Sequence, residues 1–186
     1  MDNKRELTNE LIAASLKELM VTVPFEKITI RMITERAGII RPTFYYHFQD
    51  KYETLEWIVR NQLLSGMDML LERGMFDDAI KIFFSRAAEE KTFYRKAFAI
   101  IGQNSFGTIM VKALDDLFVR CVVDKDGPAK IGEPPLARRI ASSYYSMNIV
   151  SFVKLWLSQQ PDADAQEVAQ ACIYLLNHTY HDFCNR

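Results

Sequence analysis

The sequence contains few of the residues that interrupt regular secondary structure. Seven glycines and six prolines in 186 residues are too few for a collagen-like chain, a disordered chain or a turn-rich β protein. The three cysteines, Cys121, Cys172 and Cys184, are odd in number and form no Cys-x-x-Cys pair. This argues against a disulfide framework and fits a reducing compartment.

Long apolar runs are also missing. The longest stretch without a charged residue covers 97–111 and includes Gln103, Asn104 and Ser105, whereas a membrane-spanning helix needs about 20 apolar residues. Residues 1–10 are polar and charged, so no signal peptide is visible. We therefore expect a cytoplasmic protein. The net charge of −1 gives no excess of either sign that would indicate a partner class.

The chain is instead rich in helical periodicity, and we expect an all-α fold. Ile12, Leu16 and Leu19 repeat at intervals of four and three residues, which is typical of an amphipathic helix. Thr29 is a suitable cap for a second helix, and Gly38 a suitable stop. Helices are predicted over 5–21, from Thr29 to Gly38, from about Arg41, from Asp50 to about Arg73, and over 76–90, 92–101, 104–121, 136–159 and 163–183, with a loop over 123–135.

Residues 29–48 have the layout of a helix-turn-helix, in which the second helix enters the DNA major groove. Ile40, Phe44 and Phe48 recur every four residues and are expected to form one buried edge of that helix. The segment 27–51 carries five positive and two negative side chains, a net charge of +3, which suits phosphate contact. The same pattern also fits a helical hairpin with a solvated charged face.

The run Ala37-Gly38-Ile39-Ile40-Arg41-Pro42-Thr43-Phe44-Tyr45-Tyr46-His47-Phe48, followed by Lys51, strongly resembles the TetR family of transcriptional regulators. The resemblance implies a helix-turn-helix DNA-binding domain over 1–48 and a helical effector-sensing and dimerisation domain over 49–186. It implies a homodimer that binds double-stranded DNA at a palindromic operator, with no enzymatic activity, catalytic residue, metal or cofactor. Residues 48–58 and 90–98 are similar to the branch that includes dihydroxyacetone kinase operon regulators, where the signal can arrive through a partner protein.

Residue roles follow from that resemblance. The base-facing positions are Arg31, Arg41, Pro42, Thr43 and Tyr46. The phosphate-contacting positions are Thr29, Tyr45, His47 and Lys51. Ile40 stands where family members often have serine or another polar residue, and isoleucine is a poor cap. A shift of the cap to Arg41, with Pro42 first in the helix, is a local remedy, so the exact start of the recognition helix stays open.

The second region is rich in aromatic residues, which either form its core or line a cavity for an effector. The resemblance favours a possible effector pocket at Phe83, Tyr94, Phe98 and Phe106. The last two predicted helices carry continuous stripes of apolar and small residues. These stripes pack either within one chain or against a second copy across a two-fold axis, and the dimer is the favoured interpretation. These stripes are Ile140, Tyr144, Met147, Ser151 and Leu155, then Val168, Cys172, Leu175 and Thr179.

Two other functional classes fit the sequence less well. His178, His181 and Cys184 are spaced three residues apart, but zinc needs a fourth ligand, and we interpret the group as a helix end. A helical enzyme built on this group is therefore disfavoured. A helical adaptor that binds protein through the same hairpin is the remaining alternative to a DNA-binding regulator, and the motif at 43–51 argues against both.

Overall fold

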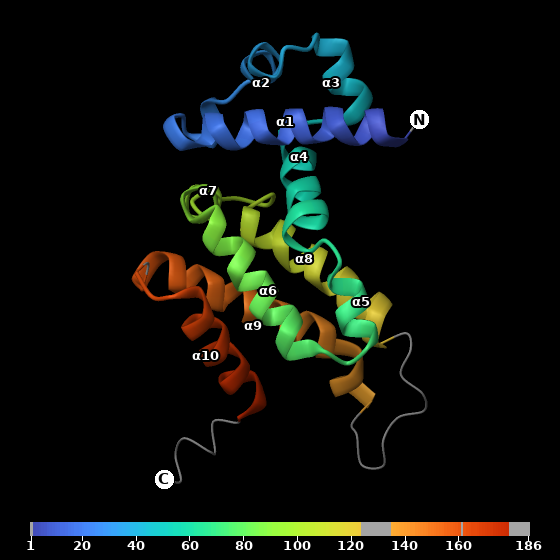
Figure 1. Cartoon of the computed structure of the whole chain (residues 1–186), viewed down its shortest axis with the longest axis vertical. Helices are drawn as coiled ribbons and strands as arrows, with labels where there is room; N and C mark the ends of the chain where they lie inside the picture. Colours follow the sequence, from blue (N-terminus) through green and yellow to red (C-terminus); the bar gives the residue numbers. More distant parts are fainter. Residues whose placement is uncertain (1, 124–134, 161, 179–186) are drawn as a thin grey trace.

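The computed structural model describes residues 2–123, 135–160 and 162–178, and within these ranges every regular element is a helix. The predicted all-α class is therefore confirmed. Helix α1 (Asp2–Thr22) crosses the molecule, with α2 (Ile30–Ala37) and α3 (Arg41–His47) packed on one side of it, at one end of the long axis (Figure 1). Helix α4 (Lys51–Ile58) leaves from the other side and leads into the remaining helices (Figure 1).

Helix α2 begins and ends at the predicted signals. The Thr29 hydroxyl accepts a hydrogen bond from the Met32 amide at 3.3 Å, which satisfies one of the unpaired donors of the first turn. Gly38 ends the helix with φ of 65°, a left-handed conformation that costs glycine little because it has no Cβ. Local chemistry is therefore sufficient to place this helix.

Helix α3 starts at Arg41, as predicted, but one residue beside its start is placed differently. Ile40, not Arg41, is the N-cap and has extended backbone, and no side chain caps this helix end. Phe44 and Phe48 are buried as expected, but Ile40 is 68% exposed. A residue at the cap lies outside the helical repeat, so its side chain leaves the buried face, and Ile39 packs against the core instead.

The single helix predicted from Asp50 to about Arg73 is wrong. Helix α4 continues as a π-helical turn, η2 (Val59–Leu63), and the chain then breaks at Gly66 before α5 (Met67–Glu72). Gly66 has φ of 70°, which a helix interior does not tolerate. The break at Gly66 therefore separates α4 and its π-helical turn from α5.

Five further helices complete the described part of the second region. They are α6 (Phe76–Glu89), α7 (Lys91–Ala97), α8 (Phe106–Phe118) with its π-helical extension η3 (Val119–Val123), α9 (Pro135–Gln159) and α10 (Ala165–Asn177). Phe84 of α6 contacts Phe152 and Trp156 of α9 through edge-on ring contacts. Most of the predicted loop 123–135 and the helix end predicted beyond 178 lie outside the described residues. No described helix is long and apolar enough to cross a bilayer.

Candidate DNA interface and ligand cavity

The residues predicted to contact DNA lie mainly on the exposed surface of α2 and α3. That surface is at the end of the molecule farthest from α9 and α10 (Figure 1). Tyr46 is 74% exposed, and Thr43 is half-buried beside the buried Phe44. The exposed members of the predicted set are Thr29, Arg31, Arg41, Pro42, Tyr45 and Tyr46. The helix-turn-helix thus presents hydroxyl, aromatic and guanidinium groups together.

Two arginines of this surface are held by carboxylates. Arg31 Nε donates to Glu35 Oε1 at 2.7 Å, and Arg36 Nη1 donates to Glu18 Oε2 at 2.7 Å. The hydrogen bond and the charge of Glu35 raise the pKa of Arg31. Ion pairs between exposed side chains are weak because solvent screens them, so a phosphate or a guanine edge can replace Glu35 at little cost.

Arg41 is oriented by the residue one turn later. Its Nη2 donates to the Tyr45 hydroxyl at 3.2 Å, and its guanidinium carbon lies 5.8 Å from the centre of the Tyr45 ring. These contacts restrict a side chain that would otherwise have many rotamers, which lowers the entropy lost when the guanidinium binds a base.

His47 is held against α1. Its Nδ1 lies 2.7 Å from the Asn9 side-chain oxygen, so Nδ1 carries the proton and donates, and Nε2 of the neutral ring is an acceptor. Partial burial lowers the pKa of His47 from its usual 6.5, and the positive charge of Arg5 adds to that effect. The ring is therefore neutral at neutral pH.

Lys51 is placed differently from the other predicted phosphate contacts. Its Nζ donates to the backbone oxygens of Phe25 at 2.6 Å, Ile28 at 2.8 Å and Glu26 at 3.3 Å, and it lies 4.4 Å from the centre of the Phe25 ring. Burial lowers the pKa of this amine, an effect that the charges of Glu26 and Asp50 oppose. Lys51 thus joins the start of α4 to η1 (Phe25–Lys27), the turn between α1 and α2.

Ile40 is a surface residue, although its spacing to Phe44 and Phe48 predicted a buried position. It lies next to Arg41 at the start of α3 and is largely exposed. Apolar side chains at this end of a recognition helix contact the methyl group of thymine. The signal available in the sequence is that a cap residue precedes the helical repeat, so the four-residue spacing to Phe44 does not apply to it.

Charged contacts join the helix-turn-helix to the second region. Lys17 of α1 donates to Glu90 Oε1 at 2.5 Å and to Gln62 Oε1 at 3.0 Å, and α1 also packs against α7. Arg60 of η2 donates to Glu56 at 2.8 Å and to Asp116 of α8 at 2.5 Å. The two regions are therefore connected through α1 as well as through α4.

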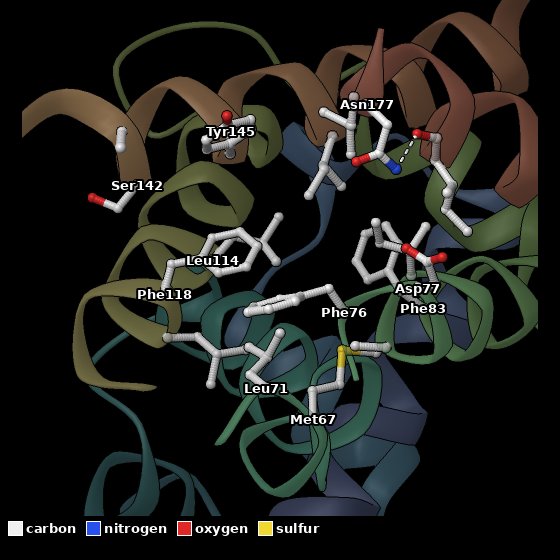
Figure 2. A pocket seen from close by; sticks show the side chains of 17 residues that line it. Met67, Leu71, Phe76, Asp77, Phe83, Leu114, Phe118, Ser142, Tyr145 and Asn177 are labelled. Carbon is white, nitrogen blue, oxygen red and sulfur yellow. Dashed lines mark hydrogen bonds between the residues drawn. The ribbon is translucent and has the colours of Figure 1, made fainter. Parts of the chain in front are cut away.

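A cavity of about 460 Å³ opens between α5, α6, α8, α9 and α10. Side chains such as Leu71, Phe76 and Leu114 occupy its interior, while Asp77, Ser142, Tyr145 and Asn177 bring the polar groups (Figure 2). A volume of this size suits a small organic ligand, and an apolar wall with few polar groups is typical of such sites.

The predicted pocket residues separate into two groups. Phe83 lines the cavity, whereas Tyr94, Phe98 and Phe106 do not. Phe106 lies 6.0 Å from Tyr94 and 5.2 Å from Phe98 between ring centres, in a cluster that also includes Phe93. Tyr94 is 2% exposed, and burial raises its pKa. These three rings form core between α7 and α8.

The stripes predicted on the last two helices are also placed differently from each other. Ile140, Tyr144, Met147 and Leu155 of α9 are each about half exposed, at 49–55%. On α10, Val168 and Cys172 are buried, and burial raises the pKa of the Cys172 thiol to about 12. Leu175 is exposed, and Thr179 lies outside the described residues. The α9 stripe is thus an apolar surface that the described chain leaves uncovered.

The predicted C-terminal group is described only in part. His178 stacks on Tyr174 with 3.9 Å between ring centres, while His181 and Cys184 lie outside the described residues. Over the ranges that the structure describes, no group of three or more metal-binding side chains is found.

Family models match most of the chain. A model described as bacterial regulatory proteins, tetR family, matches residues 12–56. A model described as a transcriptional regulator C-terminal region matches residues 76–178. Together the two models cover the helix-turn-helix and four of the five helices around the cavity, α6, α8, α9 and α10.

Curated relatives include two regulators. The dhaKLM operon transcriptional activator DhaS of Lactococcus lactis is 25% identical over 123 residues, which cover 66% of this chain and 65% of that protein. The regulator EthR of Mycolicibacterium smegmatis is 33% identical over 99 residues, which cover 52% of this chain and 40% of EthR. The chain thus aligns with less than two thirds of the length of either relative.

Solved structures with the same fold include DhaS, a dihydroxyacetone kinase operon activator. It has a TM-score of 0.63 at 21% identity, and the match covers 91% of this chain and 93% of the DhaS chain. Thermus thermophilus FadR, a transcriptional repressor solved with lauroyl-CoA, has a TM-score of 0.60 at 16% identity, with 90% and 92% of the two chains covered.

Proposed function

This chain belongs to the TetR family of bacterial transcriptional regulators, and from this premise we propose that it is a cytoplasmic, homodimeric, sequence-specific DNA-binding regulator. Residues 1–48 form its DNA-binding domain, and residues 49–186 form the domain that senses a signal and dimerises. The observation that supports this proposal best is the exposed face of α2 and α3, where Arg41 is held by Tyr45 and no acidic side chain is paired with it within the described residues.

We assign direct base readout to Arg31, Arg41, Pro42, Thr43 and Tyr46, and we add Ile40 to this set. Phosphate contacts, which set position and not sequence, come from Thr29, Tyr45 and His47. Lys51 is assigned to phosphate by resemblance, but its amine already bonds three carbonyls. Its contribution is therefore partly to hold the helix-turn-helix on α4.

Control of DNA binding by a ligand follows from the contacts that connect the cavity to the DNA-binding end. Helix α8 forms part of the cavity wall and bonds Arg60 through Asp116, so a ligand that displaces α8 changes the tilt of α4. The two recognition helices of a dimer must lie about 34–36 Å apart, or a multiple of this, to enter successive major grooves. A signal that favours this spacing recruits DNA, and one that favours another spacing releases it.

The proposal is tested with fluorescence anisotropy of the full chain on its own upstream intergenic DNA and on a random duplex. The measurement is made at about 50 and 200 mM salt, because phosphate contacts weaken steeply over that range. We expect tight, salt-sensitive binding that prefers the intergenic DNA. Equal binding to the two duplexes contradicts a specific site in that DNA, and no binding to either favours the helical adaptor instead.

Arg41→Ala tests the assignment of base readout. We expect it to cost about 1–3 kcal/mol on the preferred DNA and far less on the random duplex. Lys112→Ala, which removes an exposed positive charge from α8, is the control and leaves the preference unchanged. An equal loss on the two duplexes after Arg41→Ala contradicts the assignment.

A further inference from the structure

The wall of the cavity is apolar over most of its extent. Phe76, Phe83 and Phe118 bring aromatic rings to it, and Met67, Leu71 and Leu114 bring aliphatic side chains. In Figure 2 the labelled side chains of Leu71, Phe76 and Phe118 project toward the middle of the cavity. A ligand in this space therefore places a hydrocarbon or aromatic body against the rings.

Charge enters the described wall at one place. Asp77 is the single ionisable carboxylate among the described lining residues, and no lysine or arginine is among them. Asp77 lies on the same side of the cavity as Asn177 in the view of Figure 2. The Asn177 amide nitrogen donates to the Ile173 backbone oxygen at 3.0 Å, so this side of the cavity is rich in hydrogen-bond acceptors.

Asp77 also differs from the neighbouring carboxylate on α6. Asp78 is paired with Lys81, whose Nζ lies 3.2 Å from Asp78 Oδ1, whereas no ion pair within the described ranges includes Asp77. Both residues lie in the first turn of α6, where a negative charge interacts favourably with the helix dipole. The dipole thus accounts for both carboxylates but not for the placement of the unpaired one in the cavity wall.

A carboxylate beside apolar walls discriminates ligands by charge. Asp77 is exposed to solvent as well as lining the cavity, so its charge attracts a cation and repels an anion with the strength of a solvent-screened contact. The nearby ring faces also attract a cation and do not attract an anion. From these observations we propose that the cavity binds an apolar molecule with a single cationic, ammonium-type head group, which pairs with Asp77.

This inference rests on the proposed function, because it names the chemical class of the signal that the second region senses. It also separates this cavity from one that holds an anionic acyl group through a lysine or an arginine, because neither residue type is among the described lining residues. The charge of the ligand head group is thus the property to vary.

The test uses three probes that share a ten-carbon alkyl chain and differ in the charge of the head group. They are decyltrimethylammonium, decanol and decanoate, each below its micelle concentration. Their affinities for the full-length protein are measured by isothermal titration calorimetry. We expect the cation to bind about threefold to fivefold more tightly than the alcohol, which is the upper range of an exposed ion pair, and decanoate to bind most weakly. Decanoate binding as tightly as the cation overturns the proposal, as does equal binding of the cation and the alcohol.

Two matched variants locate the effect. Asp77→Asn is expected to bring the cation to about the affinity of the alcohol, because the charge is removed while the shape is kept. Asp78→Asn removes a carboxylate from the same helix turn outside the cavity wall and keeps the preference for the cation. A preference that survives Asp77→Asn, or is lost in both variants, overturns the assignment to Asp77. Thermal melting of each variant checks that it is folded.

DNA binding is measured on the same samples, so that the two proposals fail separately. Specific DNA binding without any preference for the cation overturns the ligand class alone. If the unsubstituted protein shows no specific DNA binding, the proposed regulator function is contradicted, whatever the cavity binds. If no probe binds, the proposal that the cavity accepts a single-chain cation is wrong.

Discussion

His47 lies at the candidate DNA interface with a protonation state set by its neighbours. Because Nδ1 donates to Asn9, the neutral ring presents Nε2 as an acceptor, which a phosphate oxygen cannot bond. Protonation turns Nε2 into a charged donor. The lowered pKa places this change below pH 6.5, and a phosphate beside the ring moves it upward toward neutral pH.

DNA affinity is therefore predicted to rise as the pH falls from about 7.5 to about 5.5, with one additional phosphate contact in the salt dependence, a slope change of about one unit. The measurement is anisotropy at several salt concentrations at each pH. His47→Gln keeps an uncharged polar side chain and is expected to flatten the pH dependence. A pH dependence that is unchanged in this variant assigns it to another group.

The contacts of Lys51 predict that this residue stabilises the fold in addition to any role in DNA binding. Lys51→Ala leaves the part-buried Ile28 carbonyl without its Lys51 donor, while the Phe25 carbonyl keeps its bond from the Ile28 amide at 3.1 Å. The loss of a partner by a buried polar group costs about 1–3 kcal/mol. We expect the free energy of unfolding in urea to fall by that amount. Lys27→Ala, at an exposed position in the same turn, is the control. Equal stability of the two variants contradicts the structural role of Lys51.

At the scale of helices, the contact between α1 and the second region adds a connection that α4 alone does not provide. Lys17 lies between Glu90 and Gln62, and its side chain is 17% exposed. Glu90→Gln leaves that ammonium group without its negative partner. We expect faster amide exchange in α7 and in the C-terminal half of α1, together with weaker specific DNA binding.

The control for this prediction is Glu89→Gln, which removes the same charge at the exposed neighbouring position. Amide exchange is read by mass spectrometry in the free protein. An exchange pattern that is the same in the two variants contradicts a coupling role for the ion pair between α1 and α7.

Element boundaries could be predicted wherever the signal lies within a few residues of the boundary. Thr29 and Gly38 mark the ends of α2 as expected, since capping and left-handed glycine are local effects. The break at Gly66 carries the same kind of signal, but the apolar repeat that continues beyond it favoured one long helix. The position of Ile40 depends on which residue is the cap, and a proline two residues later allows more than one choice.

The candidate DNA-binding surface was predictable because its residues are adjacent in the chain. The cavity was not, because five helices contribute to it and the sequence does not show which of their faces meet. Tyr94, Phe98 and Phe106 have the same aromatic character as Phe83, yet they pack against one another. Composition therefore predicted that aromatic side chains line the cavity, but not which of the aromatic residues do so.

At the scale of the whole molecule, the exposed α9 stripe predicts a dimer. Met147 lies within it and is 50% exposed, so Met147→Glu places a charge in the proposed interface, where burial without a partner costs several kcal/mol. We expect a monomer by sedimentation equilibrium and a loss of specific DNA affinity. Gln103→Glu adds the same charge to the exposed loop between α7 and α8 and leaves the dimer intact. A dimer that persists in Met147→Glu contradicts an interface on α9.

Two adjacent tyrosines on α9 have a consequence for dose response. Tyr145 lines the cavity, and Tyr144 belongs to the exposed stripe. Their rings touch edge to face, with 5.4 Å between centres. In the proposed ligand-binding dimer, occupancy of the cavity and association of two chains are linked equilibria, and linkage is reciprocal. The amount of signal needed for half-maximal response will therefore shift with the cellular concentration of the regulator itself, so that a regulator controlling its own synthesis would also set its own sensitivity.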